Sequence, residues 1–122
     1  MSAAGDRLQD TARQAALALP GTGHGYPFTK YLDVYKVAGK VFLIVTDDPD
    51  DQIIAVKCAP EHARARVRSY DTITPGRYLD KRHWISLGPG PGITKKLVTD
   101  AVEDSYDLAV ERLPRRDRPG AR

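Results

Sequence analysis

Three strand-like segments follow one another with no helix between them, and this succession limits the fold more than any other feature of the sequence. Residues 31–37, 40–46 and 52–58 are rich in β-branched and aromatic side chains. Ala38-Gly39 separates the first two segments and predicts a tight hairpin in which Gly39 supplies a positive φ. Strands joined by such short links pair in opposite directions, so the sequence predicts an antiparallel sheet.

Helical periodicity flanks this group of strands. The clearest pattern is the apolar face that recurs through residues 94–113, and weaker patterns cover residues 8–19 and a segment that begins at Pro60. A short strand over residues 83–87 precedes the last helix. The predicted order is α-β-β-β-α-β-α, which indicates an α+β domain whose antiparallel sheet has its helices packed on one face.

The length of 122 residues suits one domain, and we expect that domain to cover residues 1–113. Residues 114–122 have nothing to bury and are expected to form a disordered basic tail. The longest apolar run, residues 41–45, is too short to cross a bilayer, so no membrane partner is expected. The single cysteine, Cys58, favours a reducing cytoplasm, and we expect a monomer.

The net charge of +3 hides an uneven distribution. Residues 57–96 hold nine Lys and Arg against three Asp and Glu, and residues 112–122 hold five arginines against one aspartate. Residues 97–111, by contrast, hold five acids and no base. Because segregated charge builds a local positive potential, this pattern predicts an anionic partner more strongly than the total charge does.

The segment TPGRYLDKRHWISL, residues 74–87, places several cations beside the only tryptophan. If Ile85 and Leu87 face the helices, alternation puts Trp84 on the uncovered face, exposed beside Arg82 and Lys57, with Tyr31 and Tyr35 as further aromatic side chains. Such a face suits nucleic acid, because bases stack on aromatic rings while cations neutralise phosphates. The opposite interpretation stays open: a core tryptophan beside solvated charges. The predicted DNA-binding residues are Lys57, Arg77, Lys81, Arg82, His83 and Trp84.

Two further groups of cations are candidates for phosphate contacts. Arg64 and Arg68 lie four residues apart in the predicted middle helix and repel each other, which a phosphate would relieve, although a solvated helix face explains them as well. Thr94, Lys95 and Lys96 open the last helix, where backbone N–H groups favour an anion. Simple surface lysines are the alternative there.

No group of residues predicts catalysis, a metal site or a cofactor. The acidic run DDPDD lacks the spacing of a calcium loop, and the three histidines lack the spacing of zinc ligands. Cys58 follows an apolar strand and reads as a small core residue, and Ser105 falls within an apolar helical face without a nucleophile motif. We therefore expect a binding protein with no enzymatic activity.

Several fragments, in this order, resemble the MmcQ/YjbR family of small bacterial proteins: LPGTGHGYPF, YKVAGKVFLIV, VKCAPE, ITPGRYLDKRHWISL and DSYDLAVERL. The resemblance implies a CyaY-like fold and a DNA-binding role, with no agreed catalytic residues. Ala59 departs from the family, which often has an aspartate there to cap the following helix. The leading prediction is a non-enzymatic DNA-binding protein, and the alternative is a module that binds a protein or a small anionic metabolite.

Overall fold

The described part of the chain, residues 3–48, 50–76 and 79–120 of a computed structural model, folds into three α-helices, six strands and one 3₁₀ turn. In chain order these elements are α1 (Ala3–Leu17), β1 (Thr22–Gly25), β2 (Leu32–Val37), β3 (Lys40–Thr46), β4 (Ile54–Lys57), α2 (Pro60–Ser69), β5 (Ile73–Pro75), β6 (Trp84–Leu87), α3 (Lys95–Glu111) and η1 (Arg115–Asp117).

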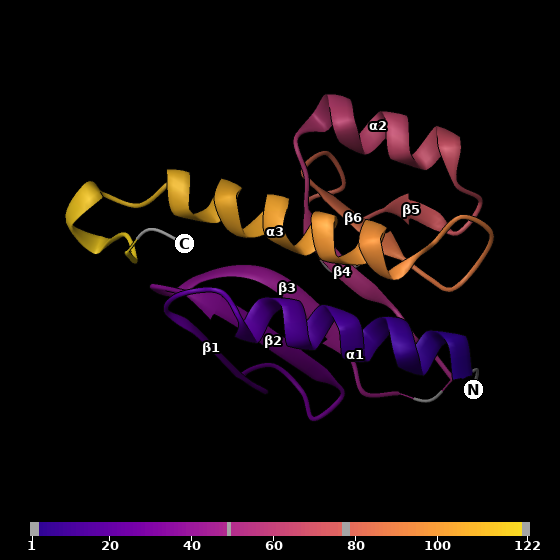
Figure 1. Ribbon diagram of the computed structural model, residues 1–122, viewed down its shortest axis with the longest axis horizontal. Coiled ribbons are helices and arrows are strands. Elements are labelled where there is room, and N and C mark those ends of the chain that lie inside the picture. The colour runs from indigo at the N-terminus through magenta and orange to yellow at the C-terminus, as the bar shows by residue number, and fades with distance from the viewer. Residues whose placement is uncertain (1–2, 49, 77–78, 121–122) are drawn as a thin grey trace.

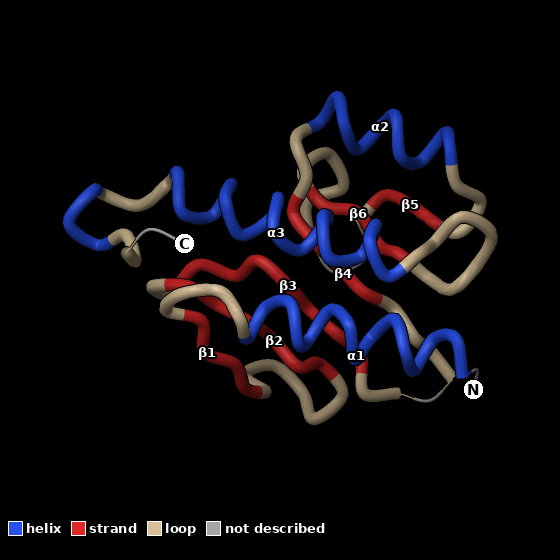
Figure 2. The backbone as a smooth tube through the Cα atoms, in the orientation of Figure 1, coloured by secondary structure: helices blue, strands red, loops and turns tan. Residues whose placement is uncertain are grey.

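All six strands belong to one sheet in the order β1-β2-β3-β4-β6-β5, and every neighbouring pair is antiparallel. The helices α1 and α3 lie side by side across one face of this sheet, and α2 packs over β5 and β6 (Figure 1, Figure 2). Ala63 of α2 belongs to the same apolar core as the inner side chains of α1 and α3, so all three helices cover the same face. The predicted α+β fold, with helices on one face of an antiparallel sheet, is confirmed.

The main core lies between the helices and the sheet. Ile85 and Leu87 of β6 are fully buried in it, as alternation along this strand predicts. On the opposite face, Val34, Ile44 and Ala55 form a second, smaller apolar cluster. The sheet therefore buries apolar side chains on both faces, although helices cover only one.

Ser105 joins α3 to the sheet through hydrogen bonds, which explains a polar residue within an apolar helical face. Its Oγ accepts a hydrogen bond from the Lys57 backbone N–H at 2.8 Å and donates one to the Phe42 carbonyl at 2.6 Å. The side chain is fully buried. Both hydrogen-bonding capacities of the hydroxyl are used inside the core, where an unpaired polar group costs about 1–3 kcal/mol.

The β2–β3 hairpin has the turn that the sequence predicts. Gly39 adopts a φ of +80° and Ala38 a φ of +47°. Positive φ at both central residues suits a two-residue hairpin, because such turns match the twist of the flanking strands. The prediction for Gly39 is confirmed, and Ala38 is a non-glycine residue in the same left-handed region.

Two strands were not expected from the sequence, and they form the two edges of the sheet. β1 lies in the glycine-rich segment that we interpreted as a loop, where His24 pairs with Tyr35 of β2. β5 has only three residues and pairs with β6. Both segments become strands because they form backbone hydrogen bonds with a neighbouring strand. Segments this short or this rich in glycine show no alternation of side chains from which a strand could be predicted.

The C-terminal segment also differs from the expected disorder. Residues 114–120 turn back through η1, and Arg118 donates hydrogen bonds to the carbonyls of Leu113 at 3.0 Å and Glu111 at 3.2 Å. These carbonyls lie at the end of α3 and lack partners within the helix, so a guanidinium stabilises them. Pro119 packs close to Gly21, where an added Cβ would lie 3.1 Å from the proline ring. The prediction of a disordered tail is wrong for these residues.

Candidate anion-binding groove

A groove between α2 and the segment that joins β5 to β6 gathers cations above an apolar floor. Arg64 and Arg68 come from α2, and Lys81 and Arg82 come from the turn before β6. All four are exposed, whereas Ala63 and Ile85 on the floor are 5% and 0% exposed. The hollow has a volume of about 360 Å³. We call its lining the basic groove, which consists of Pro60, Ala63, Arg64, Val67, Arg68, Pro75, Lys81, Arg82 and Ile85.

The helix α2 begins where the sequence predicts. Pro60 occupies its first turn, where proline's missing N–H costs nothing, and Glu61 complements the positive end of the helix dipole. Ala59 is the N-cap and makes no side-chain hydrogen bond to the helix. An aspartate at this position would stabilise the helix by about 1 kcal/mol, so α2 relies on packing against the sheet for its start.

The arginines of α2 point to two sides of the helix. Arg66 faces α3, where its Nη2 lies 3.5 Å from Asp104 Oδ2. Arg64 and Arg68, one turn apart, line the basic groove instead. The helix therefore uses one arginine for its own packing and presents two at the groove.

A hydrogen-bonded turn around Asp80 presents the other two cations. Asp80 Oδ1 accepts a hydrogen bond from the Arg82 backbone N–H at 2.8 Å, and Oδ2 pairs with His83 Nδ1 at the same distance. These contacts lower the pKa of the Asp80 carboxyl, the backbone hydrogen bond from Arg82 being the first cause and the side chain of His83 the second. The turn thus orders Lys81 and Arg82 without any contribution from a ligand.

The groove cations are not held in ion pairs by neighbouring acids, although the charge of Asp80 acts on Arg82. Among the described residues, no carboxylate forms an ion pair with Arg64, Arg68, Lys81 or Arg82. Like charges that share one concave surface repel each other and raise the local positive potential. An anion that enters the groove would relieve this repulsion.

The structure brings together only part of the predicted DNA-binding set. Lys81 and Arg82 line the basic groove, and Arg77 lies outside the described residues. The remaining three, Lys57, His83 and Trp84, are not part of the lining. His83 uses Nδ1 for its contact with Asp80.

The prediction that Trp84 is exposed is wrong. Alternation does place it on the face opposite the helices, together with Ser86 and Ala55, but Trp84 is only 7% exposed. The end of β5 lies tightly against it: Gly76 N–H donates to the Trp84 carbonyl at 2.7 Å, and a Cβ at Gly76 would lie 2.7 Å from Trp84 Cβ. The alternation of side chains along a strand decides the face on which a side chain lies. The segments packed against it decide whether the side chain reaches solvent. Trp84 therefore does not offer the exposed stacking surface that we expected.

Of the two tyrosines in the first predicted strand, one is buried and the other is exposed. Tyr35 is 1% exposed and belongs to the main core, so its expected place on an open face is also wrong. Tyr31, which lies just before β2, is 51% exposed. Because Tyr35 follows Asp33 by two residues, both side chains share the helix-covered face.

Lys57 is half-buried and lies near cations other than those of the groove. Burial lowers the pKa of its ammonium group, and the charges of Arg112 and Lys40 lower it further. Cys58, the next residue, is 4% exposed in the main core, as predicted, and burial raises the pKa of its thiol. Lys57 as a DNA contact stays a prediction.

At the start of α3, several polar groups already have partners within the helix. Thr94 is the N-cap and accepts a hydrogen bond from the Leu97 N–H at 3.1 Å. Lys96 donates to Asp100 at 2.8 Å, and this contact raises the pKa of the lysine. Lys95 is exposed. A phosphate contact at Thr94, Lys95 and Lys96 stays a prediction, and it would have to compete with Asp100.

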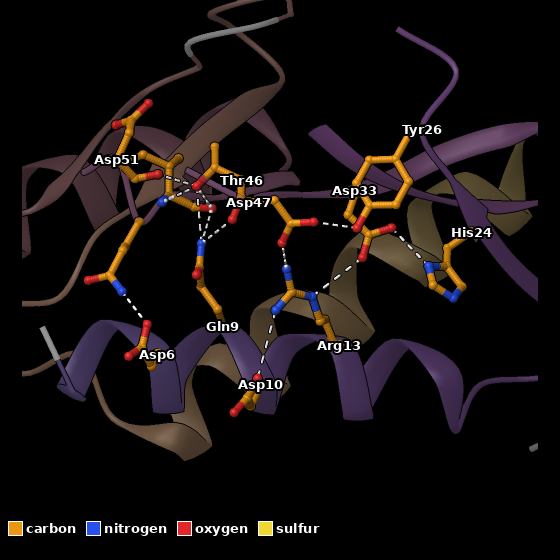
Figure 3. Close-up of polar contacts among 12 residues, drawn as sticks. Asp6, Gln9, Asp10, Arg13, His24, Tyr26, Asp33, Thr46, Asp47 and Asp51 are labelled. Carbon is orange, nitrogen blue, oxygen red and sulfur yellow. Dashed lines mark hydrogen bonds and ion pairs between the residues drawn. The ribbon is translucent and has the colours of Figure 1, made fainter. Parts of the chain in front are cut away.

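A second polar cluster, which the sequence did not reveal, joins α1, β1, β2 and the end of β3 (Figure 3). Its centre is Asp33, whose side chain is 3% exposed. Asp33 pairs with His24 Nδ1 at 2.8 Å and with Arg13 Nε at 3.4 Å, and it accepts a hydrogen bond from the Tyr35 hydroxyl at 2.8 Å. We call this cluster the N-terminal polar network, which consists of Arg13, His24, Tyr26, Asp33, Tyr35 and Asp47.

The outer part of this network is equally well paired. Arg13 also forms ion pairs with Asp10 at 3.7 Å and with Asp47, and the Tyr26 hydroxyl donates to Asp47. The His24 ring stacks on Tyr35 with centroids 4.8 Å apart and an interplanar angle of 6°. Arg13, His24 and Asp33 are far apart in the sequence, and the only local signal is the two-residue spacing of Asp33 and Tyr35. The pairing of β1 with β2 is what brings the cluster together.

Neither region resembles a metal centre or a membrane segment. Within residues 3–48, 50–76 and 79–120, no three His, Cys, Asp or Glu side chains come together as metal ligands. The helices of the same residues are all too short or too polar to cross a bilayer.

Known proteins resemble this chain over most of its length. A sequence model of the YjbR family matches residues 17–108. The uncharacterized protein YbdF of Escherichia coli O157:H7 is 36% identical over 117 residues, which cover 93% of this chain and 96% of YbdF. The uncharacterized protein YjbR of Escherichia coli K12 is 25% identical over 105 residues, which cover 86% of this chain and 89% of YjbR.

Solved structures share the fold. The Deinococcus radiodurans protein DR2400, with a DUF419 domain, superposes with a TM-score of 0.81 at 21% identity and covers 88% of this chain and 83% of its own. A protein from Pseudomonas syringae superposes with a TM-score of 0.67 at 20% identity, and the match covers 89% of this chain and 99% of that protein. The predicted family is thereby confirmed, and the chain belongs to the YjbR family.

Proposed function

We propose that the protein binds DNA and that the basic groove holds DNA phosphates. One observation carries this proposal: four exposed cations surround a single groove, and none forms an ion pair with a carboxylate among the described residues. Lys and Arg side chains that replace the counterions condensed on DNA phosphates supply most of the affinity in sequence-independent DNA binding. The groove is thus suited to gripping the backbone rather than to reading base sequence.

Each groove cation has a distinct role in this proposal. The guanidinium groups of Arg64, Arg68 and Arg82 form paired hydrogen bonds to phosphate oxygens, and Lys81 acts as a point charge. The Asp80 turn holds Lys81 and Arg82 in place before DNA arrives. Lys57, Arg77 and His83 would extend the contact beyond the groove. The protein acts by binding and not by catalysis, in the cytoplasm where DNA is accessible.

A fluorescence-anisotropy titration with labelled duplex DNA over a salt series tests the proposal. The Lys81→Ala/Arg82→Ala variant is expected to bind at least tenfold more weakly at low salt and to have a smaller salt slope. The Arg7→Ala/Lys30→Ala variant removes the same charge from α1 and the β1–β2 loop, which lie away from the groove (Figure 1), and should bind nearly as well as the unaltered protein. No binding at low salt, or equal losses in both variants, would overturn the proposal.

A second candidate function is the binding of a small anionic metabolite. The apolar floor favours it, because phosphates alone make no use of Ala63, Val67 and Ile85. A thermal-shift screen with phosphorylated metabolites distinguishes the two functions: a compound that raises the melting temperature while duplex DNA does not would favour the metabolite.

A further inference from the structure

The basic groove has two parts of different chemistry. Its floor is apolar and closed from solvent, with Ala63 at 5% and Ile85 at 0% exposed, whereas its cations are all exposed at the opening. A ligand that fills the groove must therefore carry an apolar body and an anionic group together. A bare phosphate uses only the cations and makes no contact with the apolar floor.

The size of the groove narrows the ligand further. Its volume of about 360 Å³ lies at the lower end of the range for small-molecule sites, and a DNA duplex is far too wide to enter it. In a duplex the bases are paired and stacked, so their flat faces are hidden and the protein meets only sugars, phosphates and base edges. An unpaired base, in contrast, is free to leave the stack and offer its flat face to an apolar surface.

We infer that the basic groove takes one unpaired nucleotide, with the base on the Ala63, Val67 and Ile85 floor and the phosphate among the four cations; this inference rests on the proposed DNA binding. The ligand chemistry is that of a nucleoside monophosphate. It has two sources, an unpaired nucleotide of a DNA strand and a free mononucleotide. The protein is thus a reader of single-stranded segments or strand ends rather than of continuous duplex.

The geometry of the cations supports a single phosphate at this place. Arg64 and Arg68 lie one turn apart on one side, and the Asp80 turn presents Lys81 and Arg82 as neighbours on the other. Guanidinium planes also stack on bases, so the arginines contribute to holding the ring as well as the phosphate. Arg66, which pairs with Asp104, takes no part.

Anisotropy titrations with three labelled DNAs of the same sequence test the inference: a 5′-phosphorylated single strand, a blunt duplex and a duplex with an unpaired 5′ overhang. The single strand and the overhang are expected to bind about tenfold more tightly than the blunt duplex. Unlabelled deoxyadenosine monophosphate should compete with the overhang at millimolar concentration. The Val67→Phe variant fills the floor without changing charge and should abolish the preference for the single strand and the overhang over the blunt duplex.

The outcomes separate this inference from the proposed function. Equal affinity for all three DNAs, lowered together by Lys81→Ala/Arg82→Ala, would overturn the inference and support backbone binding. Binding of the mononucleotide without binding of any DNA would identify the free nucleotide as the source and overturn the DNA proposal. The absence of binding to all four ligands would overturn both. The comparison of DNAs uses the unaltered protein, so it stands even where Val67→Phe does not fold.

Discussion

The elements that carry the N-terminal polar network and those that flank the basic groove lie in different parts of the molecule (Figure 1), and the two regions treat charge in opposite ways. In the network, Arg13 faces three aspartates, and Asp33 has three hydrogen-bonding partners. In the groove, four cations share a concave surface, and no described carboxylate pairs with them. The charges of the network are thus paired within the fold, and those of the groove are not paired by any described carboxylate.

Burial explains why the two regions differ. The Asp33 side chain is 3% exposed, so the fold must supply its hydrogen-bond donors, and removing them would leave an expensive buried charge. The groove cations are exposed, and water and salt screen their repulsion at small cost. We therefore expect changes in the network to alter stability and changes in the groove to alter binding.

The largest expected effect is that of Asp33→Ala. Loss of the shared acceptor leaves His24, Tyr35 and Arg13 without their central partner, which should lower the free energy of unfolding by about 3 kcal/mol in urea denaturation. Asp10→Ala is the matched control, because Asp10 contacts the same arginine but its side chain is 66% exposed. It should cost less than about 1 kcal/mol. Equal losses in the two variants would break the contrast between buried and exposed charge.

In the groove, Arg64→Ala/Arg68→Ala should change binding with little change in stability. Each lost phosphate contact reduces the slope of log affinity against log salt by about 0.9, so the expected decrease for duplex DNA is about 0.9 if the two arginines share one phosphate and about 2 if they hold separate phosphates. The free energy of unfolding should stay within about 0.5 kcal/mol. Arg66→Ala, on the other side of α2, is the control and should leave the slope unchanged. A slope that responds to Arg66 and not to the groove pair would place the DNA elsewhere.

The phenols of the network should titrate late. The hydrogen bond to Asp47 is the main cause that raises the pKa of Tyr26 to about 12, and burial, followed by the hydrogen bond to Asp33, raises that of Tyr35. The folded protein holds these protons more tightly than the unfolded chain, so their stabilisation is complete below about pH 10 and is lost as the pH rises through 12. Absorbance at 295 nm should therefore show delayed phenolate formation. Tyr26→Phe should remove part of the late phase.

The smallest expected effect is a gain in stability from Arg68→Gln. Like charges four residues apart on a helix destabilise it by about 0.2–0.5 kcal/mol, so relieving the repulsion with Arg64 should raise the free energy of unfolding by about 0.3 kcal/mol without ligand. Arg66→Gln, which removes the contact with Asp104, should lower it slightly. Thermal unfolding at low salt measures both. A loss of stability in Arg68→Gln would mean that the groove cations are compensated after all.

Local patterns predicted the regular part of this fold well. The Gly39 turn, the burial of Ile85 and Leu87, and the long face of α3 all depend on residues close in sequence, and each was confirmed. Alternation and helical periodicity report which side of an element a residue occupies. They also placed Lys81 and Arg82 together, because these residues are neighbours in the chain.

What the patterns missed depends on contacts between distant segments. β1 and β5 form because β2 and β6 offer them hydrogen bonds, and the network forms because β1 then holds His24 beside Asp33. Parity located the face of Trp84, and only the structure showed that this residue is closed from solvent, with Gly76 packed against its Cβ and carbonyl.

The amino-acid sequence by itself therefore determined the class of fold, the order of its main elements and the basic character of the segment before β6. Only the tertiary structure decided that Arg64 and Arg68 join Lys81 and Arg82 in one groove, while Arg66 turns to Asp104. The physical reason is that periodicity is a property of a single helix or strand. Exposure, charge compensation and the shape of a groove arise between elements, when packing brings them together.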